Sequence, residues 1–184
     1  MNGFMKNAIS CAWSLLRFCL RKVCRPGSIS FHLVERITPN VEINIGRGGK
    51  LVLGNRVRVH RNTKISVSGG ARLSIGDNTA VNRSCGFYAM EEISIGEGSE
   101  FGPGVLIYDH DHQFRGGGLK HDRFLTSPVS IGNRVWIGAN CIILRGTVIG
   151  DGCVIGAGTV VKGNIPENSL VYQERNLVIR SLTS

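Results

Sequence analysis

The chain has 184 residues and a mass of 20.0 kDa, which suffices for one domain with its own hydrophobic core. Glycine contributes 25 residues, about 14% of the chain against roughly 7% in an average protein, which argues against long helices and coiled coils. The net charge is +9, but residues 1–26 hold five basic side chains and no acidic one, so the remaining body is only mildly basic. We therefore expect no nucleic-acid partner, whereas a polyanionic small ligand or an anionic membrane surface would suit this charge.

The cysteine pattern excludes the common zinc and redox motifs. None of the six cysteines (Cys11, Cys19, Cys24, Cys85, Cys141 and Cys153) forms a C-x-x-C pair. We expect reduced thiols that behave as small apolar groups in a cytoplasmic protein. No apolar run is long enough for a membrane-spanning helix, and no small-x-small cleavage site follows the first apolar stretch, which argues against secretion.

Residues 5–23 predict an amphipathic helix. Apolar side chains recur along one side at three- and four-residue steps, namely Ile9, Ala12, Trp13, Leu16, Leu20 and Val23. Pro26 and Gly27 end the segment. Two interpretations stay open: the helix packs on the rest of the protein or on a partner subunit, or residues 5–23 make peripheral contact with an anionic membrane as a basic amphipathic helix.

A six-residue period dominates the chain after residue 40. It is strongest at Ile131, Ile137, Ile143, Ile149, Ile155 and Val161, and fainter copies occur at Ile45, Leu53, Val59, Ile65, Ile75, Val81, Phe87, Ile95, Phe101 and Ile107. Six is a multiple of the two-residue strand period but not of the helical 3.6, so these side chains point to one side of short strands. Three such segments close a coil of about 18 residues, which predicts an all-β parallel β-helix of about six coils over residues 41–165.

Residues 108–128 interrupt this period with the polar sequence YDHDHQFRGGGLKHDRFLTSP. The segment contains three of the five histidines and three consecutive glycines at positions 116–118. Long insertions in compact repeat proteins are usually functional. We therefore expect an extended, flexible loop that projects from the β-helix and contributes to a site.

The combined motifs resemble the hexapeptide-repeat O-acetyltransferases, above all the maltose, galactoside and capsule or exopolysaccharide acetyltransferases. The resemblance covers roughly residues 41–172 and is carried by IYDHDH (107–112), PVSIGNRVWIGAN (128–140) and VIGAGTVVKGNIPENSLVY (154–172). It implies a left-handed β-helix, a homotrimer, and acetyl-CoA bound in grooves between neighbouring subunits.

The resemblance implies that His110 is the catalytic base, since the family's catalytic histidine aligns with His110 rather than with His112. A sugar hydroxyl is a poor nucleophile at neutral pH, and a neutral imidazole is available to take its proton. The implied mechanism is direct attack on the thioester without a covalent enzyme intermediate. Asp109 or Asp111 would orient the ring, and the sequence leaves open which one. Asp109 and His112 are also expected at the acceptor site, while His112 as the base and solvated loop histidines remain alternatives.

A metal site is a competing interpretation of the same loop. Residues 109–112, with His121 and Asp122, contain possible ligands, and the related gamma-class carbonic anhydrases hold zinc with three histidines. A catalytic zinc site needs three rigid ligands. A D-H-D-H run in a mobile loop is a poor set of this kind, so no metal is expected.

Other residues of the implied site fall in the repeats. Asn82 aligns with a position that contacts acceptor hydroxyls, and an amide both donates and accepts hydrogen bonds. As a turn residue, Asn82 would equally well hold a corner of the coil. Trp136 is implied to line the acceptor and thioester end of the site, or it packs outward at a subunit contact. Arg83 and Tyr88 are further candidates for acceptor contact.

Small residues are implied to line the acetyl-CoA groove. Gly138 and Ala139 would let the pantetheine arm lie against the backbone, and the Ala139 N–H is implied to meet the thioester carbonyl oxygen. Gly156 and Ala157 follow one coil later on the same face, a spacing that the repeat alone would also produce.

The C-terminal end departs from the family pattern. Lys162 and Arg180 are implied to bind the 3′-phosphate of the nucleotide, although solvation is the usual state of such side chains. The segment 172–177 lacks the glycine and proline of the family's turn, and Glu174 would repel a phosphate unless it points away.

These inferences divide the chain into a basic amphipathic helix (1–26), a β-helix acyltransferase domain (27–172) and a C-terminal tail (173–184). The expected function is acetyl-CoA-dependent O-acetylation of a sugar or polysaccharide hydroxyl, in the cytoplasm and at the inner face of the membrane if the helix binds there. An amino-sugar N-acyltransferase and a serine acetyltransferase are alternatives, although the extra nucleotide-binding region and the larger helical domain typical of these enzymes are not evident. A non-catalytic β-helix scaffold is the third.

Overall fold

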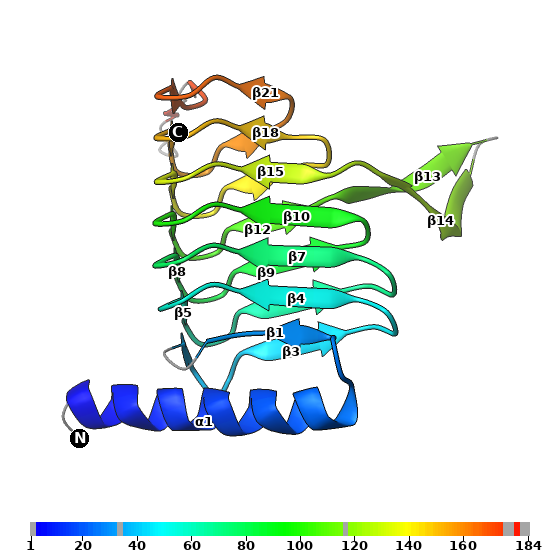
Figure 1. Ribbon diagram of the computed structural model, residues 1–184. Coiled ribbons are helices and arrows are strands. Elements are labelled where there is room, and N and C mark those ends of the chain that lie inside the picture. Colours follow the sequence, from blue (N-terminus) through cyan, green and yellow to red (C-terminus); the bar gives the residue numbers. More distant parts are fainter. Residues whose placement is uncertain (1–2, 33–34, 116–117, 175–178, 181–184) are drawn as a thin grey trace.

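The computed structural model describes residues 3–32, 35–115, 118–174 and 179–180. The helix α1 (Gly3–Cys24) lies across one end of a three-sided stack of short parallel strands (Figure 1). As the chain rises from α1, it runs leftward along the front strands of Figure 1 and rightward along the strands behind them. This sense of winding makes the β-helix left-handed, as the resemblance implied.

Each side of the stack is one parallel sheet, to which every coil adds a strand. Sheet A contains β1 (Ile29–Ser30), β4 (Lys50–Leu53), β7 (Arg72–Ile75), β10 (Glu92–Ile95), β15 (Val129–Ile131), β18 (Val148–Ile149) and β21 (Asn164–Ile165). Sheet B contains β2 (Arg36–Ile37), β5 (Arg58–Val59), β8 (Ala80–Val81), β11 (Glu100–Phe101), β16 (Trp136–Ile137), β19 (Val154–Ile155) and β22 (Leu170–Val171). Sheet C contains β3 (Glu42–Ile45), β6 (Lys64–Val67), β9 (Gly86–Ala89), β12 (Leu106–Tyr108), β17 (Ile142–Ile143) and β20 (Val160–Val161).

The core is a set of aliphatic columns that run through the coils. In sheet C, Ile107 lies in register between Phe87 of the preceding coil and Ile143 of the next, and all three side chains are fully buried. Burial alternates along the four-residue strands because successive side chains point to opposite faces. Every residue in the predicted six-residue series is buried, so the sequence pattern predicted the core correctly.

The corners between sheets need backbone conformations that few residues adopt easily. Asn62, Asn78 and Asn140 stand at corners with positive φ, in the left-handed region that asparagine tolerates better than most side chains. Gly104 and Gly152 fill equivalent corner positions at φ of +74° and +66°. The glycine excess of the composition thus follows largely from the repeated turns of one architecture.

The helix α1 covers the open edge of sheet C with its polar side. Guanidinium groups of Arg17, Arg21 and Arg25 donate to the carbonyl oxygens of Val41, Ile43 and Ile45 at 2.7, 3.3 and 3.1 Å. Four helical residues advance about 6 Å, and two strand residues advance about 6.6 Å. One arginine per helical turn therefore meets every second carbonyl of the edge strand β3, and these carbonyls find donors without a further strand.

The predicted loop is a β-hairpin. Strands β13 (His110–Arg115) and β14 (Gly118–Thr126) pair antiparallel, with an irregularity between His112 and Gln113. Figure 1 shows this hairpin projecting from the edge where sheet C strands return to sheet A. The predicted flexibility of the glycine run lies largely outside the described residues, because positions 116–117 are not among them.

Candidate active site

The hairpin leaves the β-helix where β12 would turn into the next strand of sheet A. We call this position, between sheets C and A, the C–A corner. The preceding coil makes the same corner with Met90 and Glu91. Asp109 immediately follows β12, and His110 begins β13, so the first coil-breaking residues carry the chemistry.

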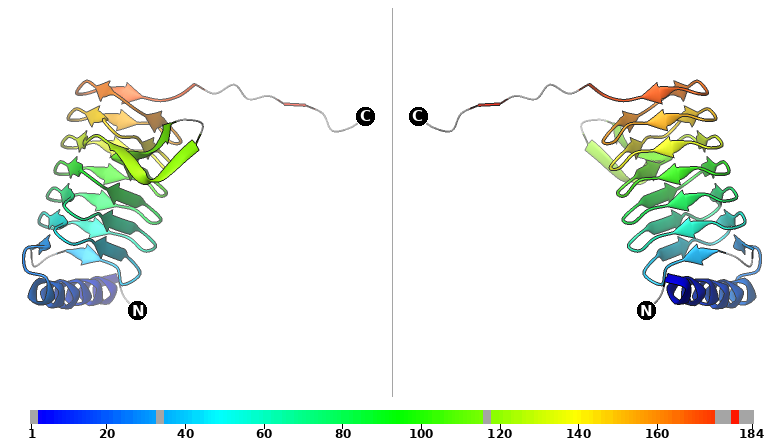
Figure 2. Two further views of the ribbon diagram at one scale, coloured as in Figure 1. Left: turned by 90° about the vertical axis from the view of Figure 1, so that its right-hand side faces the viewer. Right: turned by 90° about the vertical axis from the view of Figure 1, so that its left-hand side faces the viewer.

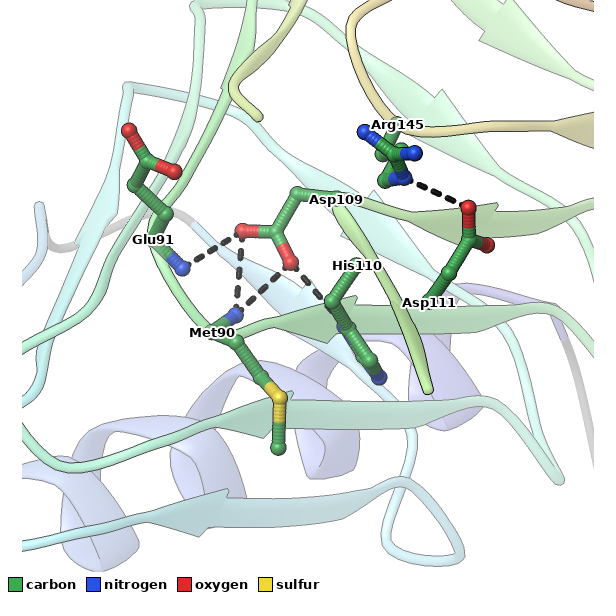
Figure 3. A network of polar contacts seen from close by, with 6 residues as sticks. All are labelled: Met90, Glu91, Asp109, His110, Asp111 and Arg145. Atoms are coloured by element: carbon green, nitrogen blue, oxygen red, sulfur yellow. Dashed lines mark hydrogen bonds and ion pairs between the residues drawn. The ribbon is translucent and has the colours of Figure 1, made fainter. Parts of the chain in front are cut away.

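The Asp109 carboxylate is fully buried and ties this corner to the coil below it. Its oxygens accept hydrogen bonds from the backbone N–H of Met90 at 2.8 and 3.0 Å and from that of Glu91 at 2.7 Å (Figure 3). Backbone donors fix a carboxylate firmly because they belong to the fold itself. Direct contact between Asp109 and a substrate, which the sequence led us to expect, is therefore wrong: the carboxylate is enclosed by its own chain.

Asp109 also orients His110. Its Oδ1 lies 3.0 Å from Nδ1 of His110, whose side chain is 16% exposed. Because an ionised carboxylate only accepts, Nδ1 is the donor in this contact, and the neutral ring carries its free electron pair on Nε2. The structure thereby answers the question of which aspartate orients the histidine.

Asp111 has a different partner. Its Oδ2 accepts from Nε of Arg145 at 2.5 Å, and both side chains are partly exposed. Arg145 comes from the C–A corner of the next coil, so this ion pair fastens the base of the hairpin to the coil above (Figure 3). The sequence analysis missed Arg145, because nothing in its local sequence signals a contact with a residue 34 positions earlier.

Aromatic rings surround His110 on the remaining sides. The rings of Tyr108 and Phe124 meet the imidazole edge-on, with centroids 6.0 and 5.6 Å away. Tyr108 stacks on Tyr88 of the preceding coil at 4.9 Å, and burial, together with the nearby Tyr88, raises the pKa of Tyr108. Phe124 also contacts His112, which is itself exposed. These rings limit the movement of the imidazole and reduce its contact with water.

A small open hollow joins these side chains. Tyr108, His110, Asp111, His112 and Leu144 line it. A more extensive hollow lies near the C-terminal end of α1, where Arg25, Arg47 and Lys50 are among its lining residues. That second hollow contains no group suited to act as a general base, so the first is the better candidate for catalysis.

The remaining predicted residues lie on another edge of the molecule. Asn82, Ala139 and Ala157 occupy the turns between sheets B and C, which we call the B–C corner, and Trp136 stands on sheet B with 57% of its surface exposed. Figure 1 shows the hairpin projecting from the side opposite to β5 and β8 of sheet B. A single chain therefore brings together residues 108–112 but does not bring them to Trp136 or to the B–C corner.

The B–C corner shows why small residues are needed there. A Cβ on Gly138 would lie 2.6 Å from the backbone nitrogen of Ala157, and a Cβ on Gly156 would lie 2.9 Å from Cβ of Tyr172. Stacking of the coils alone thus requires both glycines. Ala139 is partly exposed and Ala157 exposed, so this corner presents backbone and methyl groups rather than long side chains.

Asn82 and the C-terminal cations have simple local surroundings. The side-chain oxygen of Asn82 accepts from the backbone N–H of Arg83 at 2.8 Å, which supports the corner-holding interpretation, while the residue stays exposed. Lys162, Glu174 and Arg180 are exposed. Within the described residues no group of three or more histidine, cysteine, aspartate or glutamate side chains is arranged to hold a metal ion.

Comparisons with known proteins agree with this architecture. Residues 128–162 match the family model of the hexapeptide repeat of succinyl-transferase. The chain is 32% identical over 90 residues to the galactoside O-acetyltransferase of Escherichia coli (strain K12), across 49% of this chain and 44% of the relative. It is also 32% identical to the crystal structure of a maltose O-acetyltransferase from Clostridium difficile 630, with a TM-score of 0.50 and coverage of 71% and 64% of the two chains.

A more distant structure shares the fold alone. AntD, an N-acyltransferase from Bacillus cereus in complex with dTDP and coenzyme A, superposes with a TM-score of 0.69 over 90% of each chain at 21% identity. The chain spans about half the length of the curated relatives it matches. Together these matches confirm the predicted resemblance to the hexapeptide-repeat acetyltransferases.

The buried contacts of Asp109 lead to a stability prediction. Asp109→Ala leaves the Met90 and Glu91 amides without an acceptor, so we expect it to lower the free energy of unfolding by about 2–4 kcal/mol. Asp111→Ala removes a partly exposed ion pair and should cost less than about 1 kcal/mol. Chemical denaturation of both variants beside the unaltered protein measures the difference. Equal effects would show that Asp109 is not the anchor of this corner.

Proposed function

We propose that the protein transfers an acetyl group from acetyl-CoA to a hydroxyl of a sugar or polysaccharide, with His110 as general base. The observation that supports this best is the pairing of Nδ1 of His110 with the buried Asp109 beside an open hollow. Such pairing holds one tautomer and one orientation of the ring, which a base needs to meet a hydroxyl repeatedly in the same geometry.

The chemistry follows from this arrangement. Nε2 of His110 takes the proton from the acceptor hydroxyl as its oxygen attacks the acetyl carbonyl, and the ring later returns that proton to the leaving thiolate. The Asp109 carboxylate stabilises the imidazolium formed between these two steps. No nucleophilic side chain of the protein is needed, because the hydroxyl attacks directly.

Acetyl-CoA would supply the acetyl group as an activated thioester. The B–C corner fits a long, thin ligand because Ala139 and Ala157 are small and at least partly exposed. We assign Gly138, Ala139, Gly156 and Ala157 to the pantetheine arm, with the Ala139 N–H as donor to the thioester oxygen. Lys162 and Arg180 are assigned to the nucleotide phosphates.

A homotrimer would complete the site. His110 and the proposed pantetheine residues occupy different edges of one chain, so a second copy must bring its B–C corner to the hairpin of the first. A head-to-tail contact of this kind closes into a ring when the rotation between neighbours permits. In that ring the Trp136 and Asn82 of one subunit would face the His110 and His112 of another, where they can bind the acceptor.

O-acetylation has more support than N-acylation. The galactoside and maltose O-acetyltransferases are similar to this chain in sequence, whereas AntD shares only the fold. We place the reaction in the cytoplasm, where acetyl-CoA is made and where reduced thiols such as the buried Cys85 and Cys141 are usual.

Loss of the imidazole should abolish transfer without loss of the donor site. We expect His110→Ala to lower kcat by about 10²–10⁴-fold and to leave acetyl-CoA affinity unchanged, because the ring acts on the acceptor hydroxyl. His112→Ala is the matched control and should reduce kcat by less than about tenfold. Release of coenzyme A in the presence of a panel of mono- and oligosaccharides gives the rates. A fully active His110→Ala protein would overturn the proposed mechanism.

The two-subunit site predicts complementation. Ala157→Trp should block the proposed groove, since position 157 is exposed and can hold a larger side chain without disturbing the coil. Each of His110→Ala and Ala157→Trp alone should be nearly inactive. Co-expressed in equal amounts, they should recover roughly a quarter of full activity, because one site in four then combines an intact corner from each of two subunits. If the mixture stays inactive, both sets of residues act within one chain or the groove is elsewhere.

A further inference from the structure

The apolar side of α1 faces away from the rest of the protein. Its large residues are between 44% and 80% exposed, namely Met5, Ile9, Trp13, Leu16, Leu20 and Val23. We call these six residues the outer face of α1. They follow one another at three- and four-residue steps along the whole helix, and Figures 1 and 2 show the helix lying flat across the end of the stack. A continuous apolar stripe of this length is unusual on the surface of a soluble domain.

The contacts on the opposite side fix this orientation. Phe18 is buried against Phe31, and the hydroxyl of Ser14 bonds to both the N–H and the C=O of Ile37. The arginine contacts with the β3 carbonyls add three more connections along the helix. Turning the helix to bury its outer face would break all of these contacts and leave the sheet C edge unsatisfied.

The charge around the helix favours a negatively charged partner. Residues 1–26 carry five basic side chains and no acidic one. The carbonyl partners of Arg17, Arg21 and Arg25 are dipoles that leave the arginine charges uncompensated. Burial and the charge of Arg21 lower the pKa of Arg17, as expected where like charges gather. Two copies joined through the outer face would set these positive ends against each other, whereas an anionic surface would complement them.

We propose that the outer face of α1 lies in the interface of a membrane that contains anionic phospholipids. The helix would rest parallel to the surface with its apolar residues among the acyl chains, and the coils would rise away from it. Trp13 would lie at headgroup depth, where indole rings are favoured. No helix in the described part of the chain has the length and apolar character to cross a bilayer, so this contact is peripheral. The inference rests on the geometry of α1 and holds whether or not the proposed reaction is correct.

Sedimentation with vesicles tests the proposal without any activity measurement. The unaltered full chain should bind vesicles of phosphatidylcholine and phosphatidylglycerol, and more weakly those of phosphatidylcholine alone. The combined variant Trp13→Gln, Leu16→Gln, Leu20→Gln should bind at least about tenfold more weakly, because three apolar side chains no longer enter the bilayer. Its fold should persist, since glutamine is a good helix former and these positions make no core contacts.

A matched control separates position from composition. Val148→Gln, Val160→Gln, Leu170→Gln changes three exposed apolar residues of the C-terminal coils and should bind vesicles as the unaltered protein does. The proposal is overturned if the unaltered protein stays in the supernatant with anionic vesicles, or if both triple variants bind equally. Sedimentation velocity adds a further outcome: absent vesicle binding, a larger assembly lost only in the α1 variant would assign the face to a second copy.

The tryptophan provides an independent reading of depth. In a Trp136→Phe background, Trp13 is the only tryptophan of the chain. Its emission should shift to the blue with anionic vesicles and be quenched by brominated lipid. An unchanged spectrum at vesicle concentrations that sediment the protein would contradict insertion of the outer face.

Discussion

Every coil of a parallel β-helix must satisfy the backbone of its neighbours, and the two functional features of this molecule arise where that pattern is interrupted. At the C–A corner the hairpin replaces an ordinary turn, and the Asp109 carboxylate accepts the Met90 and Glu91 amides of the coil below. At the open end of sheet C no further strand exists, and Arg17, Arg21 and Arg25 donate to its carbonyls. In both places a charged side chain takes over a role that backbone otherwise fills.

These substitutions for backbone have direct consequences for function. Because Asp109 is held by the fold, it can in turn hold His110, and the proposed base inherits its position from the coil register. Because the arginines occupy the inner side of α1, its apolar residues must face outward. Coils repeat at about 4.8 Å, so a membrane beneath α1 would lie roughly 25 Å from His110. The outer sugars of a lipid-linked glycan would be suited to that distance.

The sequence predicted the repeated part of the structure and left its interruptions open. The six-residue period identified the buried columns because each aliphatic residue meets the same residue class one coil away. The period carries no such information for residues 108–128, so the hairpin, the role of Asp109 and the contact with Arg145 depended on the tertiary structure. The apolar side of the helix was visible in the sequence. That it faces outward was not, because this depends on the match between a helical turn and two strand residues.

The central claim is that this β-helix binds acetyl-CoA and presents it to His110. Calorimetric titration of the purified protein with acetyl-CoA tests this claim most directly, since it needs no knowledge of the acceptor. We expect a Kd between micromolar and sub-millimolar, about −5 to −8 kcal/mol, with competition by coenzyme A and unchanged affinity in His110→Ala. Absence of heat and of competition at millimolar ligand would contradict the acetyltransferase account and leave the fold to serve as a scaffold.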